Sequence, residues 1–200
     1  MLPLFPLLLT PQFHAPAAVP PALQEQTMPL WWGRWRQVPA FKAGFTQEGE
    51  SSAFGKLTKT GTILAAKGGR LRLEYDKGTL LLSDGRLLTQ HDPSTRTAQR
   101  FEIEGVMDEW PLLRLLLDPL DVGGAFHVKS LGGGAVALTP KKPGLPEVTL
   151  RGGGDFPSKI EWKDATGATQ VLTLTNPKAV PGPKAASFDF VPPKGTKWVK

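Results

Sequence analysis

The chain has 200 residues, with 24 Lys or Arg against 18 Asp or Glu, a formal net charge of +6, and no cysteine. The lack of cysteine excludes disulfides, thiolate metal sites and thiol nucleophiles, and because the basic residues are scattered rather than clustered with aromatics, we expect no nucleic-acid binding. The 22 glycines and 20 prolines favour turns and short strands over long helices, in a chain long enough for one domain with a hydrophobic core.

The first 21 residues have the composition of a targeting segment. Met1–Leu9 is apolar, and Ala15 and Ala17 are small residues of the kind that signal peptidase accepts. A disordered leader, or a start codon that trims a fuller signal, is the alternative, because no Lys or Arg precedes the apolar run. The sequence nowhere reaches the roughly 20 apolar residues that span a bilayer. We therefore predict a signal peptide or leader over 1–21 and a single exported, soluble domain over 22–200.

A helix is predicted to follow the leader. It covers about Leu23–Val38 and is kinked or broken at Pro29. Trp31, Trp32 and Trp35 make one side of this helix strongly apolar.

Short runs of alternating apolar and polar residues come next, separated by glycine-containing turns. In residues 70–75, Leu71, Leu73 and Tyr75 share one face while charged residues occupy the other, which is the period of a half-buried strand. The sequence SDG at 83–85 supplies a tight turn of the kind that joins hairpin strands. About eleven such strands predict a mainly β (α+β) protein with one large antiparallel sheet, rolled into a barrel or half-barrel.

One short helix interrupts the strands, within the sequence EWPLLRLLLDPL at 109–120. Pro111 suits the first helical position and Asp118-Pro119 stops the helix. Leucines leave almost no polar face, so the helix must be buried. It is either a plain core helix or a plug for the open side of the curved sheet. The leucines are Leu112, Leu113, Leu115, Leu116 and Leu117.

Residues that carry catalysis or bind metals are isolated in this sequence. His14, His91 and His127 belong to no H-x-H or H-E-x-x-H motif, so no metal site is predicted. No G-x-S-x-G nucleophile motif occurs, and the glycine triplets at 132–134 and 152–154 lack the Lys-Ser/Thr of a phosphate loop. We therefore expect no enzymatic activity, no catalytic residue and no cofactor.

Six segments in order resemble the outer-membrane lipoprotein carrier family, LolA. The resemblance runs from about Gln37 to Lys200, and the six together are more specific than any one of them. They are FTQEGE (45–50), GKLTKTGTILAAKGGRLRLEY (55–75), LLLSDGRLLTQHDP (80–93), ALTPKK (137–142), IEWKDATGATQVLTL (160–174) and FDFVPPKGTKW (188–198).

The resemblance implies a strongly curved, incomplete β-barrel whose open face is covered by helices. It implies a hydrophobic cavity that carries the acyl chains of lipoproteins across the periplasm, from an inner-membrane ABC-type lipoprotein-releasing transporter to an outer-membrane acceptor. The receptor of this fold is anchored through an acylated cysteine, which this chain lacks, so we expect a freely diffusing monomer. The expected lid residues are Leu112, Leu113, Leu115 and Leu116. The expected cavity wall is Phe45, Leu71, Leu73, Tyr75, Phe101, Ile103, Trp162 and Phe190.

One departure from the family concerns the cation that holds the lid. Where the family has Arg-Pro at the end of its second strand, this chain has Lys67-Gly68. Lysine keeps the charge but loses the planar fork of five donors. Either Lys67 or nearby Arg70 is expected to hold the lid. Because of this departure, the cargo and the partner can differ from those of the better-known family members. The alternative function is transport of another lipid, or binding of lipoproteins as a sensor.

Overall fold

The computed structural model describes residues 27–51, 55–107, 111–117, 119, 122–164 and 166–199. The leader predicted over 1–21 and the beginning of the predicted N-terminal helix lie outside these residues. The helices are α1 (Leu30–Gln37), α2 (Ile103–Met107), α3 (Pro111–Leu117), α4 (Val122–Ala125) and the 3-10 helix η2 (Ala185–Phe188). The first six strands are β1 (Ala40–Ser51), β2 (Gly55–Ala66), β3 (Arg70–Tyr75), β4 (Leu80–Asp84), β5 (Leu87–Asp92) and β6 (Thr97–Glu102). The other six are β7 (Phe126–Gly132), β8 (Ala135–Pro140), β9 (Val148–Gly153), β10 (Phe156–Lys163), β11 (Thr169–Val180) and β12 (Lys197–Trp198).

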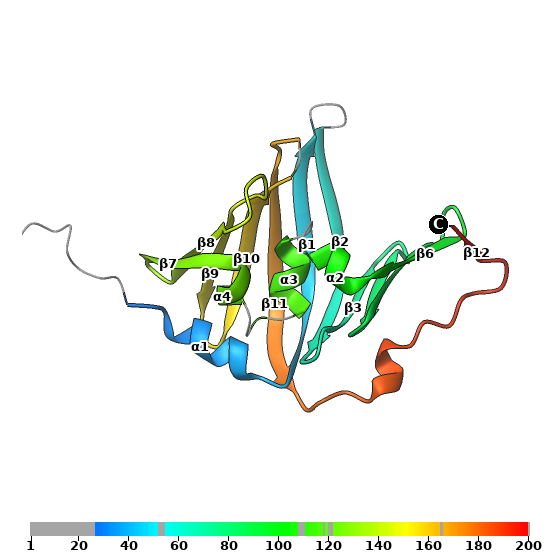
Figure 1. The fold of residues 1–200 in the computed structure, drawn as a ribbon, viewed down its shortest axis with the longest axis horizontal. Helices are drawn as coiled ribbons and strands as arrows, with labels where there is room; N and C mark the ends of the chain where they lie inside the picture. The colour runs from blue at the N-terminus through cyan, green and yellow to red at the C-terminus, as the bar shows by residue number, and fades with distance from the viewer. Residues whose placement is uncertain are drawn as a thin grey trace, which may run out of the picture.

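All twelve strands belong to one open sheet with the order β12-β6-β5-β4-β3-β2-β1-β11-β10-β9-β8-β7. Successive hairpins build each flank, and the long antiparallel pair β1–β11 joins the two flanks in the middle. In Figure 1 the strands form a curved wall, with β7–β10 on one side and β3–β6 on the other. The mainly β fold and the incomplete barrel are confirmed, because β7 and β12 are the outer strands of this sheet and do not pair with each other.

The sheet order dictates where the short helices run. Strand β6 lies at one flank and β7 at the other edge, so the chain between them must cross the sheet. That crossing carries α2, α3 and α4, which lie in front of the strands in Figure 1. The backbone N–H of Ile103 donates to the carbonyl of Arg86 at 3.0 Å and fixes the start of the crossing. Lys141 fixes its end, donating from its side chain to Gly123 O at 2.7 Å and from its backbone to Ala125 O at 2.9 Å.

One large hydrophobic cluster fills the concave face. It unites buried side chains from all four α-helices with inward-facing residues of strands on both flanks. Every second residue of a strand points to the same face, so each strand contributes only its alternate, inward-facing side chains to the cluster. Of the predicted leucine-helix residues whose side chains are described, Leu113, Leu115, Leu116 and Leu117 belong to this cluster.

Gly61 permits a close approach where the sheet bends between β1 and β3. It stands opposite Phe45 on β1 and Tyr75 on β3. A Cβ at this position would lie 2.0 Å from the carbonyl oxygen of Glu74. Because glycine has none, the rings of Phe45 and Tyr75 meet edge to face, with 5.2 Å between their centroids.

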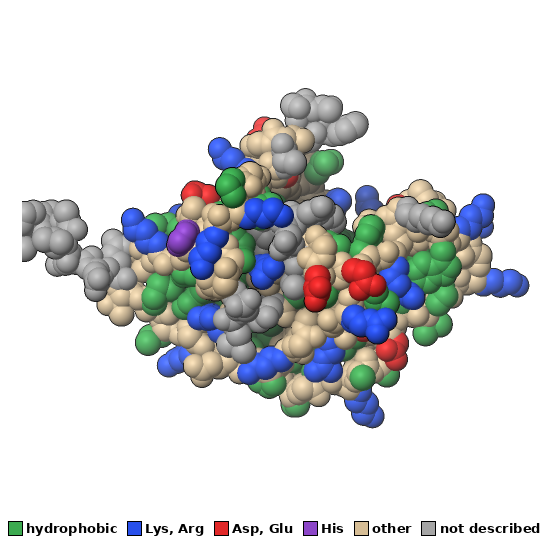
Figure 2. Space-filling model, viewed as in Figure 1, with side chains coloured by type: hydrophobic (Ala, Val, Ile, Leu, Met, Phe, Trp, Pro, Cys, Tyr) green, Lys and Arg blue, Asp and Glu red, His purple; other side chains and the backbone are tan. Residues whose placement is uncertain are grey.

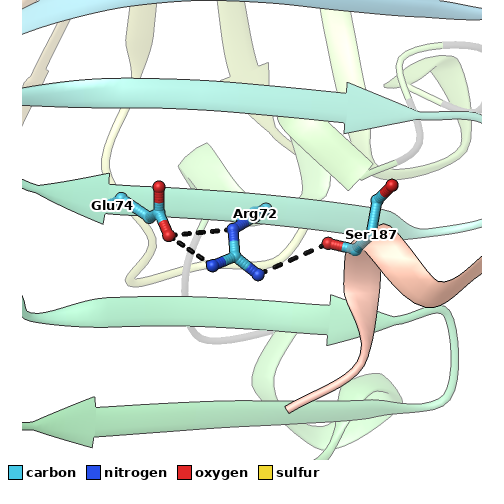
Figure 3. A network of polar contacts seen from close by, with 3 residues as sticks. All are labelled: Arg72, Glu74 and Ser187. Carbon is cyan, nitrogen blue, oxygen red and sulfur yellow. Dashed lines mark hydrogen bonds and ion pairs between the residues drawn. The ribbon is translucent and has the colours of Figure 1, made fainter. Parts of the chain in front are cut away.

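The C-terminal segment covers the outer, convex face of the sheet. Phe188 of η2 is buried there in a small cluster with Ala40 and Ala66. Arg72 ties the segment to β3, since its side chain pairs with Glu74 and donates to the carbonyl of Ser187 at 3.5 Å. Figure 3 shows Arg72 reaching both partners.

Two details of the predicted strands are wrong at the C-terminus. The alternating sequence SFDFVPP at 187–193 predicts a strand, but it begins within η2 and residues 189–193 are irregular. The twelfth strand is instead the two-residue β12, which pairs in parallel with β6. The ring of Phe190 lies 5.5 Å from His91 and 5.7 Å from Trp198. His91 and Leu88 lie three positions apart on β5, so their side chains point to opposite faces of the sheet, and Leu88 belongs to the concave cluster. Phe190 therefore packs on the outer face and does not line the interior.

Candidate functional site

The leucine helix α3 closes the concave face. Leu113, Leu115, Leu116 and Leu117 are all at most 3% exposed, and α3 contacts β2 and β3. The side chain of Leu112 lies outside the described residues. Seven residues are too few for a helix to hold in water alone, so α3 depends on these contacts for its shape.

The expected wall residues fall into three groups. Phe45, Leu71, Leu73 and Ile103 are buried in the concave cluster, although Ile103 begins α2 rather than continuing a strand. The partly buried Tyr75 and Trp162 pack against that cluster. Phe101 is 38% exposed on β6, opposite the inward-facing Leu88, so it lies on the concave side of the sheet at its flank.

The concave face opens into a groove beside the β1–β2 hairpin. Its volume is about 520 Å³, and Leu57, Tyr75 and Leu81 supply apolar surface. The hydroxyl of Tyr75 donates to Gln47 Oε1 at 3.0 Å, and the ammonium of Lys59 lies 5.6 Å from the centre of the Tyr75 ring. Burial raises the pKa of Tyr75 above its usual value, so the phenol stays neutral as a hydrogen-bond donor. The groove therefore joins an apolar interior to a polar rim.

Neither cation predicted to hold the lid has a polar contact with α3 in the described part of the chain. Arg70 has the parity of the outer face, where its guanidinium lies 5.5 Å from the Phe188 ring and its Nε donates to Lys67 O at 3.2 Å. Lys67 is exposed in the β2–β3 turn, with its backbone N–H bonded to Pro39 O at 3.0 Å. Alternation along β3 turns Arg70 away from the concave side, so its contacts in this structure are on the outer face.

A different cation reaches the chain just beyond α3. Arg36 on α1 donates from Nε to the carbonyl of Pro119, just beyond the end of α3, at 2.6 Å. Its guanidinium also lies 5.2 Å from the centre of the Trp32 ring. Because α1 contacts β9 and β10 whereas α3 contacts β2 and β3, this hydrogen bond spans the two flanks of the sheet. No local pattern in the sequence indicates this contact, since its partners are 83 residues apart.

The three tryptophans of α1 face the interior and form an aromatic cluster. The helix begins at Leu30, directly after Pro29, where the sequence predicted a break. Trp31, Trp32 and Trp35 are all buried. Their ring centroids lie 5.9–6.4 Å apart, and Trp35 continues the cluster to Phe41 at 6.3 Å. This cluster covers β9 and β10 on the flank opposite α3. Sequence analysis found the apolar side of this helix but did not assign it to the site.

Charge on this side of the molecule is mainly basic. Figure 2 shows Lys and Arg side chains spread over the face that carries α2–α4, with fewer acidic ones.

Within residues 27–199, as far as they are described, no group of three or more His, Asp or Glu is placed to hold a metal ion. Of the helices in the described ranges, none has the length and apolar character needed to cross a membrane.

Comparison with known proteins identifies a family that matches most of the chain. The family model for outer membrane lipoprotein carrier protein LolA matches residues 36–191. An outer-membrane lipoprotein carrier protein from Bordetella avium (strain 197N) is 31% identical over 127 residues, which span 60% of this chain and 60% of the relative's length.

Two solved structures share the fold at low sequence identity. A LolA superfamily protein from Nitrosomonas europaea superposes with a TM-score of 0.51 at 12% identity, covering 80% of this chain and 96% of that one. An uncharacterized conserved protein from Thermus thermophilus also gives 0.51, at 13% identity, covering 84% and 96%. The match over residues 36–191, together with the open sheet crossed by a leucine helix, shows that this chain belongs to the LolA family.

Proposed function

We propose that this protein is a periplasmic carrier that binds the acyl chains of lipoproteins and shuttles them from the inner to the outer membrane. The observation that carries the proposal is the position of α3, whose four described leucines fill the concave face of an open sheet. Membership of the LolA family and similarity to the Bordetella avium protein named as an outer-membrane lipoprotein carrier support it. The proposed partners are an inner-membrane ABC-type lipoprotein-releasing transporter and an outer-membrane acceptor.

Energetics explain why such cargo needs an enclosed site. Burial of an acyl chain contributes roughly 0.8 kcal/mol per methylene, so a chain of about 14 methylenes gains on the order of 10 kcal/mol. An aqueous intermediate with several such chains is feasible only if an apolar surface covers them. The concave cluster offers that surface once the leucines of α3 move aside, since it is continuous across both flanks.

We infer that α3 moves as a unit within the crossing segment. Its two ends are fixed to the sheet, at Ile103 and at Lys141. Before the fixed end at Lys141, Gly105 of α2 has no side chain and no neighbouring segment within 4 Å of the place of a Cβ. Apolar contacts and the hydrogen bond from Arg36 to Pro119 hold the middle. We infer that cargo displaces α3 and takes the place of its leucines.

Dye displacement tests the proposed function. We expect an environment-sensitive apolar dye to bind saturably, and a diacylated peptide to displace it at near-equimolar concentration because both occupy the apolar interior. The same peptide without acyl groups is the control and should leave the dye bound. Displacement by detergent or free fatty acid, but not by the diacylated peptide, would contradict lipoprotein carriage and favour transport of another lipid.

A further inference from the structure

The α1 tryptophan cluster contains one buried polar atom without a partner. Trp35 is 1% exposed, and its indole Nε1 has no hydrogen-bond acceptor in the described part of the chain. Trp31, four residues earlier on the same helix, donates from its own Nε1 to Gly134 O at 3.0 Å. Unpartnered buried donors are rare in folded proteins and call for an explanation, such as an absent ligand.

The surroundings of Trp35 define which ligand could supply the acceptor. Its ring neighbours are Trp31, Trp32 and Phe41, which offer apolar surfaces and no acceptor oxygen. A trapped water needs two to four polar partners, which these rings do not provide. A carboxylate or phosphate would be buried as an uncompensated charge at high cost. The ligand must therefore be largely apolar and carry a neutral acceptor.

We propose that the Trp35 indole N–H binds a carbonyl oxygen at the head of a cargo acyl chain, an ester or amide carbonyl. The inference rests on the proposed function and assigns it a specificity-determining residue. Indole is a donor only, so it pairs with a carbonyl and not with a methylene. Trp35 and the α3 leucines belong to one buried cluster that is continuous across both flanks, so the donor lies in the same apolar interior that cargo would occupy, on the flank opposite α3. The free donor in the closed protein gains its partner when cargo binds.

The test compares ester and ether lipids on matched variants. The probes are a peptide with an S-[2,3-bis(palmitoyloxy)propyl]cysteine and its counterpart with two hexadecyl ethers, which has the same chains without carbonyls. The protein should bind the ester about five- to tenfold more tightly, as expected for one hydrogen bond in a buried site. Trp35→Phe should remove this preference and leave the affinity for the ether nearly unchanged. A general loss of packing would instead weaken the binding of both lipids to the same extent.

Trp31→Phe is the control variant. Trp31 lies on the same helix in the same cluster, but its N–H is already bonded to Gly134 O. This variant should unfold more easily, because it leaves that carbonyl without its donor, while keeping the preference for the ester. If Trp35→Phe fails to fold, benzothienylalanine at position 35 replaces the N–H by sulfur at nearly constant shape and supplies the same comparison.

Each outcome separates the inference from the proposed function. Equal affinity of the unaltered protein for ester, ether and N-palmitoylated ether, or a preference for a carbonyl-bearing lipid that survives Trp35→Phe, overturns the role of Trp35 and leaves lipoprotein carriage intact. If the protein binds neither the ester nor the ether, both the role of Trp35 and the proposed function are overturned. An ether-linked peptide with an added N-palmitoyl group distinguishes the two sources of the carbonyl. Preference for it that depends on Trp35 assigns the bond to the amide, and its absence assigns the bond to the ester.

Discussion

Leu115→Asp is expected to give a folded protein with a cooperative melt and at least tenfold weaker binding of a diacylated peptide. Leu115 is 0% exposed in the middle of α3. A buried carboxylate without a partner is costly, but a movable α3 can swing outward and place it in water. The variant then loses the lid contacts that would cover the cargo. A thermal melt and a dye titration on the same sample measure both effects.

Leu150→Asp is the matched control. Leu150 is also 0% exposed, but it lies in β9 between Ile160 of β10 and Val136 of β8. A carboxylate there has no route to water without breaking the sheet, so this variant should not fold. Truncating a fixed core leucine alone costs about 2–5 kcal/mol, a large part of the stability of an ordinary domain. Loss of the cooperative melt in Leu115→Asp as well would mean that α3 is fixed core and not a lid.

Arg36→Gln is expected to raise the apparent affinity for an apolar dye by about tenfold and to speed its binding. The arginine Nε donates to Pro119 O at 2.6 Å, and this bond favours the closed form. Hydrogen bonds that involve a charged group contribute about 1.5–3 kcal/mol, and tenfold corresponds to about 1.4 kcal/mol. If dye binds only the open form, its apparent dissociation constant falls as the open fraction rises. Equilibrium titration and stopped-flow fluorescence measure the two quantities.

Arg34→Gln provides the control on the same helix. Arg34 pairs with Asp155 at 2.7 Å, and both side chains are more than half exposed. Exposed ion pairs contribute little to stability, and Asp155 lies in the β9–β10 turn, away from the lid segment. Dye binding should be unchanged. If Arg36→Gln and Arg34→Gln bind dye alike, the bond to Pro119 does not control the lid.

Strand alternation predicted the sheet and much of its inner face, because a period of two depends on local sequence alone. It placed Leu71 and Leu73 together, and both are buried in the concave cluster. The same reasoning failed at Phe190, where the chain leaves the sheet and packs on its outer side. Alternation has no meaning outside a strand, and Pro192-Pro193, two residues after Phe190, is a local sign that regular structure ends there.

The short helices and their contacts were harder to predict. The leucine helix was found from its composition, but α2 and α4 are five and four residues long and contain glycine, so they have no helical period to detect. Arg36 was missed because its partner depends on how two distant segments cross the sheet. The family pattern directed attention to Lys67 and Arg70 instead. Tertiary contacts of a single side chain are therefore the least predictable part of this site.

Photo-crosslinking tests most directly whether cargo lies under α3. A diacylated peptide with a diazirine at the end of one acyl chain would be bound, irradiated, digested and mapped by mass spectrometry. The adducts should fall on concave residues such as Leu71 and Ile160 or on α3 itself, and the free diacylated peptide should compete with them. Adducts confined to the outer face, around Phe188 and Phe190, would contradict an acyl-chain site inside the curved sheet.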